Sequence, residues 1–461
     1  MQSQNEPICA LITPPGYAAI NVLRISGHGS SGIVAQFFRP RAKLLKSPSH
    51  TAVFGTFFDK GGHPLDQLLC TVFRAPHSYT GEECVEISCH GNPRIASRIL
   101  ENLLVEARLA RPGEFTLRAL LNGKLDLTQA EAVNDLITAT GSKAEAAALM
   151  QVQGVLGRHL QGLLDAITEA RLRCELAIDF ADQDLPQLDL EDLDRRISDI
   201  LEQAKALHSE GSRGKLIREG IRVCLAGPPN SGKSSLFNAF LKFNRAIVTP
   251  HPGTTRDYLE ESVSLHGYTL VLYDTAGLRE SEDSSEKEGI RRSRELMQNA
   301  DLVLFLNEAA AAGTTTESEE LPENLYNKIL WVASKFDLLM PACAKADSYP
   351  ARDGLSPQTG IPVSVQATGG MEALCEAILQ RFELPDEIPQ RPLVTNARQF
   401  AALSRCVTAM QSAQKSLREQ AGFEFTAFDL TEASQALEEI LGIVTADDLL
   451  ERIFSGFCIG K

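Results

Sequence analysis

The stretch Gly227-Pro-Pro-Asn-Ser-Gly-Lys-Ser-Ser235 decides the fold of the middle of the chain. It matches the pattern G-x-x-x-x-G-K-[ST], whose glycines let backbone N–H groups turn onto phosphate oxygens. The motif has this meaning between a strand and a helix. Here the apolar run 221–226 precedes it and a helix-length segment follows it. A chance match in a chain this long is on the order of a few per cent, since glycine makes up about 7% of residues. The stretch therefore predicts a phosphate-binding loop.

Two further elements follow this loop in the order that is typical of a GTPase. Asp274-Thr-Ala-Gly277 ends the apolar run 269–273, so that Asp274 can approach Mg²⁺ and the Gly277 amide can face a γ-phosphate. Between the two lies Gly253-Thr-Thr-Arg-Asp257, in which a threonine can complete the metal shell. We expect Lys233 to reach the terminal phosphates and Ser234 to hold Mg²⁺. The residues of the loop expected to bind the nucleotide are Asn230, Ser231, Gly232, Lys233, Ser234 and Ser235.

The segment that would select the base is Ser334-Lys-Phe-Asp337, where GTPases usually carry Asn-Lys-x-Asp. Asp337 can accept hydrogen bonds from both N1–H and the exocyclic amine of guanine, and the stem of Lys335 can lie along the base. Ser334 is shorter than asparagine and is expected to lose the tie that normally joins this loop to the phosphate loop. Ser364-Val365 stands where Ser-Ala is usual, and there the backbone N–H matters more than the side chain. These residues favour guanine over adenine. An ATPase stays the alternative, and a base-competition assay would separate the two.

One position does not fit the usual arrangement for positioning water. Many GTPases orient the attacking water with a glutamine directly after the DxxG glycine, whereas this chain has Leu278 there. An apolar side chain cannot orient water, so the catalytic group must come from elsewhere. The segment that follows offers Glu280, Glu282, Asp283, Glu286 and Glu288.

The pattern of apolar residues divides the chain into regions of different type. Residues 1–122 mix short strands (20–25 and 84–88) with an expected helix at 95–107, which predicts an α+β domain. Apolar residues recur at helical spacing in 123–216 and again in 385–461, so these two segments are expected to form one helical domain. The insert 217–384 alternates strand-like and helix-like runs, which predicts a Ras-like P-loop domain with a mainly parallel sheet. Its expected strands are 221–226, 269–273, 302–306, 329–333 and 361–365. The fold class is thus a multidomain α/β protein.

Composition sets broad limits on function. Of the 461 residues, 43% are hydrophobic and 23% are charged, a balance typical of globular proteins. A net charge of −15 argues against broad attraction to nucleic acid, although a local basic patch or a basic partner could still hold RNA. There is no apolar run of membrane-spanning length and no secretory or transit signal, so we expect a cytoplasmic protein without a membrane span. The ten cysteines are scattered without a CxxC pair and are expected to be reduced and mostly buried.

An ordered set of short motifs runs through the chain and resembles the MnmE (TrmE) family of tRNA-modification GTPases. The motifs are Thr13-Pro-Pro-Gly16, Leu23-Arg-Ile-Ser-Gly27, Tyr79-Thr-Gly-Glu82, Val85-Glu-Ile-Ser-Cys-His-Gly91, Arg111-Pro-Gly-Glu-Phe-Thr-Leu-Arg118, Leu121-Asn-Gly-Lys-Leu-Asp-Leu127, Ala130-Glu-Ala-Val133 and Phe457-Cys-Ile-Gly-Lys461. The resemblance implies a folate-binding, dimerising N-terminal domain, a helical domain made from both flanks, and an inserted G domain.

The resemblance also implies roles for particular residues. The family's folate contacts match Arg24, Glu86, Lys124 and Lys461. Its K⁺ ligands match Asn230, Thr249, the His251 backbone and Thr254, and its Mg²⁺ ligands match Ser234 and Thr255. The three threonines thereby join the expected GTP-binding residues. The family's water-positioning glutamate matches Glu286, which would resolve the puzzle of Leu278. K⁺ would supply the positive charge that other GTPases obtain from an arginine.

The implied biology is modification of C5 of the wobble uridine, position 34, of certain tRNAs to a carboxymethylaminomethyl or aminomethyl group. The one-carbon unit would come from 5-formyltetrahydrofolate or a related tetrahydrofolate. The implied assembly is a homodimer that works with the flavin- and NADH-using subunit MnmG (GidA). A GTPase switch in ribosome assembly, with no tRNA chemistry, is the alternative, but it leaves the N-terminal domain and the tail cysteine unexplained.

The tail Cys458-Ile-Gly-Lys461 follows an expected helix with Thr445 and Asp448 at capping-box spacing. Because Gly456 disfavours continuation of that helix, the last residues are expected to form a projecting, strand-like end. A thiol, a flexible glycine and a cation within four residues suit a substrate or folate pocket better than a core. We therefore predict a catalytic role for Cys458. The other two residues predicted to be catalytic, Lys233 and Glu286, belong to the nucleotide site.

Overall fold

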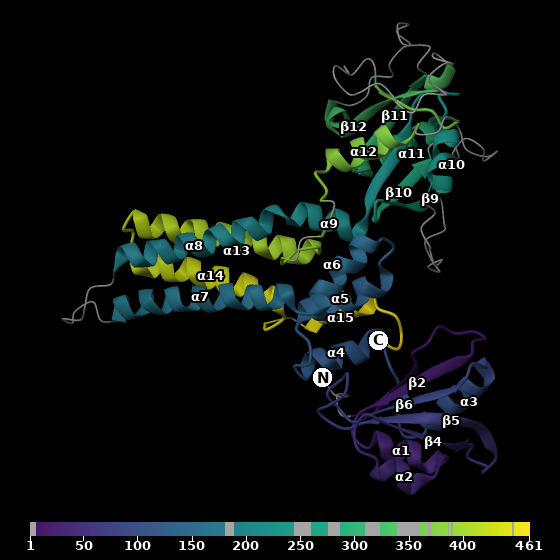
Figure 1. Cartoon of the computed structure of the whole chain (residues 1–461). Helices are drawn as coiled ribbons and strands as arrows, with labels where there is room; N and C mark the ends of the chain where they lie inside the picture. The colour runs from purple at the N-terminus through teal and green to yellow at the C-terminus, as the bar shows by residue number, and fades with distance from the viewer. Residues whose placement is uncertain are drawn as a thin grey trace. The chain divides into compact units, whose positions relative to one another are not determined.

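A computed structural model describes residues 6–179, 189–243, 260–274, 286–308, 323–338, 360–366, 370–385, 387–388, 391–444 and 447–461. The chain divides into two compact units, and its helices and strands are drawn in Figure 1. The first unit holds 1–134, 152–197 and 412–461, and the second holds 135–151 and 198–411. The division into four segments at 1–122, 123–216, 217–384 and 385–461 stays a prediction.

The first unit contains a seven-stranded sheet of order β3-β4-β5-β6-β2-β1-β7. Neighbouring strands are antiparallel except β1 and β7. The strands are β1 (Ile8–Leu11), β2 (Ile20–Ser26), β3 (Phe38–Arg39), β4 (Thr51–Phe58), β5 (Pro64–Phe73), β6 (Cys84–His90) and β7 (Arg108–Leu109). The helices of this part are α1 (Ser30–Phe37), α2 (Arg41–Lys46), α3 (Pro93–Leu103) and α4 (Glu114–Leu121). The prediction of an α+β domain with strands at 20–25 and 84–88 is confirmed.

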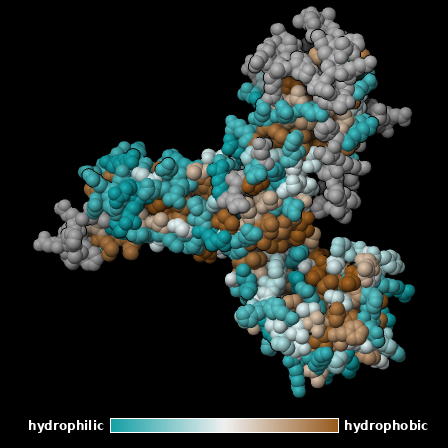
Figure 2. Space-filling model, viewed as in Figure 1, coloured by the Kyte–Doolittle hydropathy of each residue, from teal (hydrophilic) through white to brown (hydrophobic). Residues whose placement is uncertain are grey.

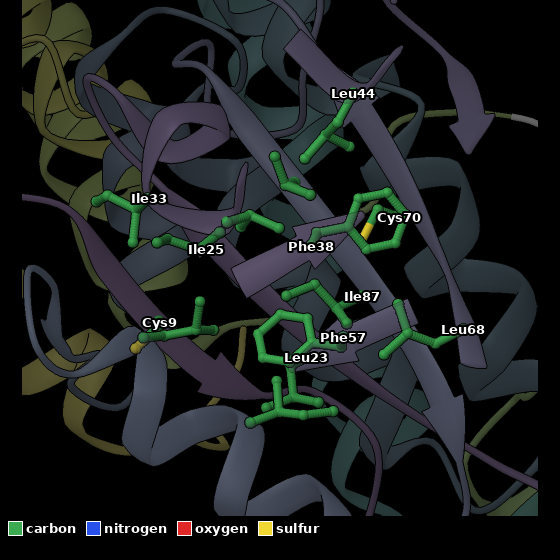
Figure 3. Packing of buried hydrophobic residues seen from close by; sticks show 14 of the residues in the cluster. Cys9, Leu23, Ile25, Ile33, Phe38, Leu44, Phe57, Leu68, Cys70 and Ile87 are labelled. Carbon is green, nitrogen blue, oxygen red and sulfur yellow. The ribbon is translucent and has the colours of Figure 1, made fainter. Parts of the chain in front are cut away.

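The two faces of this sheet have different roles. Figure 3 shows Leu23, Ile25, Phe57 and Ile87 packed together, and they share their core cluster with residues of α1 and α3. Since side chains alternate along a strand, Arg24 lies on the opposite face from Leu23 and Ile25. Hydrophobic side chains are also visible on the surface of the sheet domain in Figure 2. The cross-strand neighbours Phe54 and Leu69 are among the exposed apolar residues.

Helix α3 is shorter than predicted. Asn92 caps its start, because the Asn92 side chain accepts a hydrogen bond from the backbone N–H of Arg94. The helix ends at Leu103, whereas the sequence suggested 107. The chain turns after Leu103 so that Arg108 can enter β7, where its N–H donates to the Pro7 carbonyl (2.9 Å). Pairing in the sheet thus overrides local helical periodicity.

Helices from distant parts of the sequence pack side by side in the same unit. α7 (Val155–Asp179) lies along α14 (Phe423–Leu441), as Figure 1 shows. Their apolar stripes are buried, as predicted for Leu160, Leu163, Leu164, Ile167, Leu437, Ile440 and Leu441. Val444, predicted on the same stripe, is exposed because the helix ends at Leu441 and Gly442 adopts a left-handed cap (φ 80°). α5 (Leu127–Thr138) and α15 (Asp447–Ser455) complete this region.

The second unit contains a six-stranded sheet of order β13-β12-β11-β8-β10-β9, parallel except between β9 and β10. The strands are β8 (Ile221–Ala226), β9 (Glu260–Leu265), β10 (Tyr268–Asp274), β11 (Leu302–Glu308), β12 (Ile329–Ser334) and β13 (Ile361–Pro362). Its helices are α6 (Ser142–Val152), α9 (Gly211–Glu219), α10 (Lys233–Phe243), α11 (Glu286–Asn299) and α12 (Glu372–Arg381). It also holds residues 198–209 of α8 (Leu190–Ser209) and 397–411 of α13 (Ala397–Arg418). The mainly parallel sheet is confirmed. β9 was not predicted, because this edge strand buries only Val263 and Leu265.

The inserted sheet is joined to helical segments within the same unit. The N–H of Lys143 in α6 donates to the Gly267 carbonyl in the β9–β10 turn (3.0 Å). The hydroxyl of Tyr268 in β10 donates to the Pro385 carbonyl (2.6 Å). The amide of Gln151 in α6 donates to the Leu393 carbonyl (2.9 Å), which joins α6 to the segment before α13. Across the described ranges, no helix is long and apolar enough to cross a bilayer.

Candidate functional site

The phosphate loop connects the end of β8 to the first residue of α10, Lys233. Three of its residues have positive φ: Gly227 (137°), Asn230 (62°) and Gly232 (93°). A Cβ at Gly227 would lie 2.3 Å from the Leu306 carbonyl oxygen, so only glycine fits between this loop and β11. Glycine at position 227 is therefore required by the close packing of the loop on β11 as well as by phosphate binding.

The Lys233 ammonium lies on its own loop. Its Nζ donates to the carbonyl oxygens of Gly227 (2.9 Å) and Pro228 (2.7 Å). Asn230, Ser234 and Ser235 are exposed, whereas Ser231 is buried. This arrangement leaves the polar groups of the loop at the surface beside the helix N-terminus, where an anion is favoured.

Ser334 does not behave as the sequence suggested. Its hydroxyl donates to the Ser231 carbonyl (2.6 Å) and lies 3.1 Å from the Asn307 carbonyl oxygen. The expected loss of the tie between the base loop and the phosphate loop is therefore wrong. The order β12-β11-β8 brings the end of β12 close enough for a short side chain to reach. Ser334 is buried, which strengthens this hydrogen bond.

The residues expected to contact the base are held together by side chains. The Ser364 hydroxyl donates to Asp337 Oδ1 (2.7 Å), which joins the loops that follow β12 and β13. Lys335 has positive φ (55°), and its Nζ lies 3.2 Å from Glu308 Oε2 at the end of β11. Sequence reasoning missed Glu308. Its place at the carboxyl end of a strand next to β8 is the signal that could have found it.

Several predicted residues of the nucleotide site cannot be placed. Asp274 ends β10 and pairs with Leu225 in the ladder, and Glu286 begins α11, but their side chains lie outside what the structure describes. The residues wholly outside the described ranges are Thr249, His251, Thr254, Thr255 and Gly277. The roles assigned to all of these stay predictions.

A second group of predicted residues meets on the sheet of the first unit. Arg24 in β2 and Glu86 in β6 are cross-strand neighbours, and Arg24 Nη2 lies 2.7 Å from Glu86 Oε1. The guanidinium carbon of Arg24 lies 5.2 Å from the ring centre of Tyr79 and 5.4 Å from that of Phe115. Two aromatic faces and one carboxylate thus hold a cation that is only 12% exposed.

The tail reaches this group and does not project. The N–H of Gly113 donates to the Cys458 carbonyl (3.4 Å), and that of Phe115 donates to the Lys461 carbonyl (3.2 Å). The tail forms a turn in which the Lys461 N–H also donates to the Cys458 carbonyl (3.3 Å). The predicted strand-like, projecting end is therefore wrong, because the free N–H groups at the start of α4 bind the tail carbonyls.

Charges at the tail and at the sheet influence one another. Partial burial lowers the pKa of Lys461, and the charge of Arg24 lowers it further, while Cys458 and Glu86 act in the opposite direction. Cys458 itself is exposed, whereas the other eight cysteines in the described ranges are buried. Arg24, Glu86, Cys458 and Lys461 therefore form one electrostatic neighbourhood, although they lie at opposite ends of the sequence.

Lys124 lies apart from this group. Its exposed ammonium donates to the Pro76 carbonyl (3.2 Å), and its stem packs near Gly81. Among the contacts of the described residues, none joins Lys124 to Arg24, Glu86 or Lys461.

A buried ionic network beneath the site was not foreseen. Arg118 Nη1 lies 3.1 Å from both carboxylate oxygens of Glu82, and Arg118 Nη2 lies 3.3 Å from Glu114 Oε1. Arg108 pairs with Glu114 as well, and the Ser26 hydroxyl donates to Glu82 (2.7 Å). Burial alone would raise the pKa of Glu114, but hydrogen bonds from Arg108 and the Arg111 N–H outweigh it and lower the pKa. The motifs 79–82 and 111–118 contain Glu82, Glu114 and Arg118, but their spacing does not reveal the pairing, and Arg108 lies outside both motifs.

Comparisons with known proteins cover the whole chain. Two family models match it: the GTP-binding protein TrmE N-terminus over residues 7–124 and the MnmE helical domain over residues 127–458. The tRNA modification GTPase MnmE of Aquifex aeolicus (strain VF5) is 40% identical over 460 residues, which covers 99% of this chain and 100% of the relative. That of Moorella thermoacetica is 40% identical over 473 residues, with 99% and 100% covered. The crystal structure of the G domain of the T. maritima FeoB iron transporter is 28% identical and covers 35% of this chain and 98% of that chain, at a TM-score of 0.21.

Proposed function

The chain belongs to the MnmE family of tRNA modification GTPases, and we propose that K⁺ activates its GTP hydrolysis. We further propose that it modifies C5 of the wobble uridine of tRNA with a folate one-carbon unit and a flavin-dependent partner subunit, MnmG. The family makes it a GTP hydrolase that acts in tRNA modification. Membership also argues against the ribosome-assembly switch and the ATPase as alternatives. We place the activity in the cytoplasm.

The nucleotide site supports the assignment of guanine. Ser334 and Ser364 fix the positions of the phosphate loop and of Asp337 through hydrogen bonds of 2.6 and 2.7 Å. A carboxylate held in one orientation can accept both N–H groups of guanine, whereas adenine offers no such pair. Guanine selection by this chain therefore rests on a serine hydroxyl where other GTPases use an amide.

The exposed side chains of the loop fit the two proposed cations. Asn230 has positive φ and is exposed, and Ser234 is exposed at the start of α10. Both are oxygen donors beside a phosphate site, as hard cations require. When bound, the cations supply positive charge that stabilises the phosphoryl transition state. Asn230 would hold K⁺ with Thr249, His251 and Thr254, and Ser234 would hold Mg²⁺ with Thr255. Glu286 would orient the water.

The potassium proposal has a direct test. GTP turnover at equal ionic strength is expected to be much higher in K⁺ than in Na⁺, and Asn230→Ala is expected to abolish the difference. Asn238→Ala alters an exposed asparagine of α10 outside the loop and serves as the matched control. Equal rates of the unchanged protein in both salts would remove the potassium mechanism.

The observation that carries the folate proposal is the meeting of Arg24, Glu86 and the tail. The Glu86 carboxylate can accept the N–H groups of a pterin, while Arg24 and Lys461 suit the carboxylates of the glutamate moiety. The rings of Tyr79 and Phe115 supply apolar faces next to these charges. The exposed apolar pair Phe54 and Leu69 supports pairing of two such domains in a homodimer.

Titration calorimetry with 5-formyltetrahydrofolate tests this assignment. The intact chain is expected to bind without any nucleotide, and Glu86→Ala is expected to weaken binding at least tenfold with GTP turnover unchanged. Glu106→Ala removes an exposed carboxylate of the same domain, which accepts a hydrogen bond from the Gln36 amide, and should have no effect. Absence of binding to the intact chain would remove the one-carbon proposal.

A further inference from the structure

The tail turn caps helix α4. The first N–H groups of a helix have no partner within the helix, and Gly113 before α4 provides no side-chain cap. The carbonyls of Cys458 and Lys461 accept hydrogen bonds from Gly113 and Phe115 in that place. The position of the tail is therefore set by backbone contacts with α4.

Gly460 is required for this arrangement. It has φ 102°, which residues with a side chain rarely adopt, and it is buried. A Cβ there would lie 2.8 Å from the Leu11 carbonyl oxygen and 2.9 Å from Ile12 Cα. Both are backbone atoms at or just after the end of β1, where Leu11 pairs with Leu23 of β2 and the Ile12 N–H donates to the Val22 carbonyl (2.8 Å). Because these backbone atoms are held by the neighbouring strand, we expect a side chain at 460 to displace the tail.

Gly113 meets a similar constraint from the other side. It has φ 66°, and a Cβ there would lie 2.9 Å from both the carbonyl oxygen and Cδ1 of Phe454 at the end of α15. Phe454 packs against Phe457 with ring centres 5.0 Å apart, and both are buried. The approach of α15 and the tail to α4 thus depends on the absence of a side chain at 113.

Phe115 connects the docked tail to the charged pair. Its N–H binds the Lys461 carbonyl, and its ring packs on the Arg24 guanidinium. We propose that Gly460 and Gly113 are positioning residues for the modification reaction, because they hold the tail turn on α4 and thereby keep Cys458 and Lys461 beside Arg24 and Glu86. This inference rests on the proposed function of the tail.

The variants Gly460→Ala and Gly113→Ala test the proposal against a matched control in the same segment. Gly456→Ala is the control, because Gly456 is exposed and its added Cβ would meet nothing closer than the Ile453 carbonyl oxygen at 3.8 Å. Two readouts are taken on each preparation. Amide hydrogen exchange of the peptide containing Phe115 reports the docking of the tail. Mass spectrometry of tRNA incubated with GTP, the folate and the flavin-dependent subunit reports modification.

Both variants are expected to raise exchange at Phe115 at least tenfold and to lower modification at least tenfold, with GTP turnover within twofold of the unchanged chain. Asn122, whose N–H donates to the Arg118 carbonyl at the end of α4 (2.9 Å), serves as an internal reference and should stay protected. GTP turnover and Asn122 protection also show that the variant is folded.

Three results would overturn the proposal. One is unchanged amide exchange at Phe115 in both variants. Another is raised exchange at Phe115, which shows that the tail is released, together with undiminished tRNA modification. The third is equal loss of modification in Gly456→Ala. If the unchanged chain gives no tRNA modification while the Phe115 N–H stays protected, the result refutes the proposed function and not the docking of the tail. The positioning role is then refuted as well, because it depends on that function.

Discussion

The nucleotide site and the tail site are assembled in different ways. The nucleotide site consists of short motifs at the carboxyl ends of adjacent parallel strands, so each motif is complete within a few residues. The tail site joins β2, β6, the start of α4 and the last four residues, and no single motif contains it. Local spacing therefore reveals the first kind of site, whereas the second becomes visible only when the chain is folded.

The largest effect is expected from a substitution that disables the nucleotide site and leaves the tail site unchanged. Lys233→Ala removes the ammonium that lies on the phosphate loop, and we expect GTP hydrolysis to fall roughly 100- to 1,000-fold, as for loss of a transition-state contact. Folate binding, measured by calorimetry, should not change. Lys242→Ala at the other end of α10 is the control. A parallel loss of folate binding would show that the two sites are not independent.

The converse change disables the second site. Cys458→Ser is expected to abolish wobble-uridine modification while K⁺-stimulated GTP hydrolysis is retained, because the thiol lies outside the nucleotide site. Cys174→Ser, in the core of α7, controls for loss of a thiol without loss of the tail. Modification by the Cys458 variant at the normal rate would refute the role of the tail, and loss of both activities would mean that Cys458 maintains the fold.

A smaller effect is expected at Ser334. Ser334→Ala leaves the Ser231 carbonyl without its donor, and we expect about a fivefold loss of GTP affinity, which corresponds to one neutral hydrogen bond of about 1 kcal/mol. Competition of GTP with ATP measures the effect, and the preference for GTP should narrow. Ser262→Ala on the edge strand β9 removes a serine hydroxyl from the same sheet and is the matched control. An unchanged preference would show that the tie does not contribute to base selection.

The smallest effect concerns the ionic network under the tail site. The pKa of Glu114 is lower in the folded chain than its ordinary value of 4.5. Its stabilising contribution is therefore fully present above pH 4.5 and is lost as the pH falls toward the folded value. Urea unfolding of the first unit should show a weaker dependence on pH below about 5 in Glu114→Gln than in the unchanged chain. Identical pH profiles would contradict the assigned pairing.

More of the nucleotide site than of the tail site could be predicted from the sequence, and the reasons are physical. The phosphate loop could be predicted because strand-loop-helix spacing fixes its conformation locally, whereas the base-binding roles of Asp337 and Ser364 stay predictions. The hydroxyl tie of Ser334 could not be predicted, since it depends on the order of β12, β11 and β8. The docking of the tail was missed because it depends on free N–H groups of a helix that lies far earlier in the chain. Resemblance pointed to Arg24 and Glu86, but only the fold brings the rings of Tyr79 and Phe115 to Arg24.

The central claim is that GTP hydrolysis and the tail site serve one reaction on tRNA. Its most direct test is mass spectrometry of wobble uridine after tRNA is incubated with this chain, the flavin-dependent subunit, GTP and 5-formyltetrahydrofolate. The account predicts a C5-modified uridine with the unchanged chain, and none with either Lys233→Ala or Cys458→Ser. Modification that persists in both variants, or unmodified uridine with the unchanged chain, would contradict it.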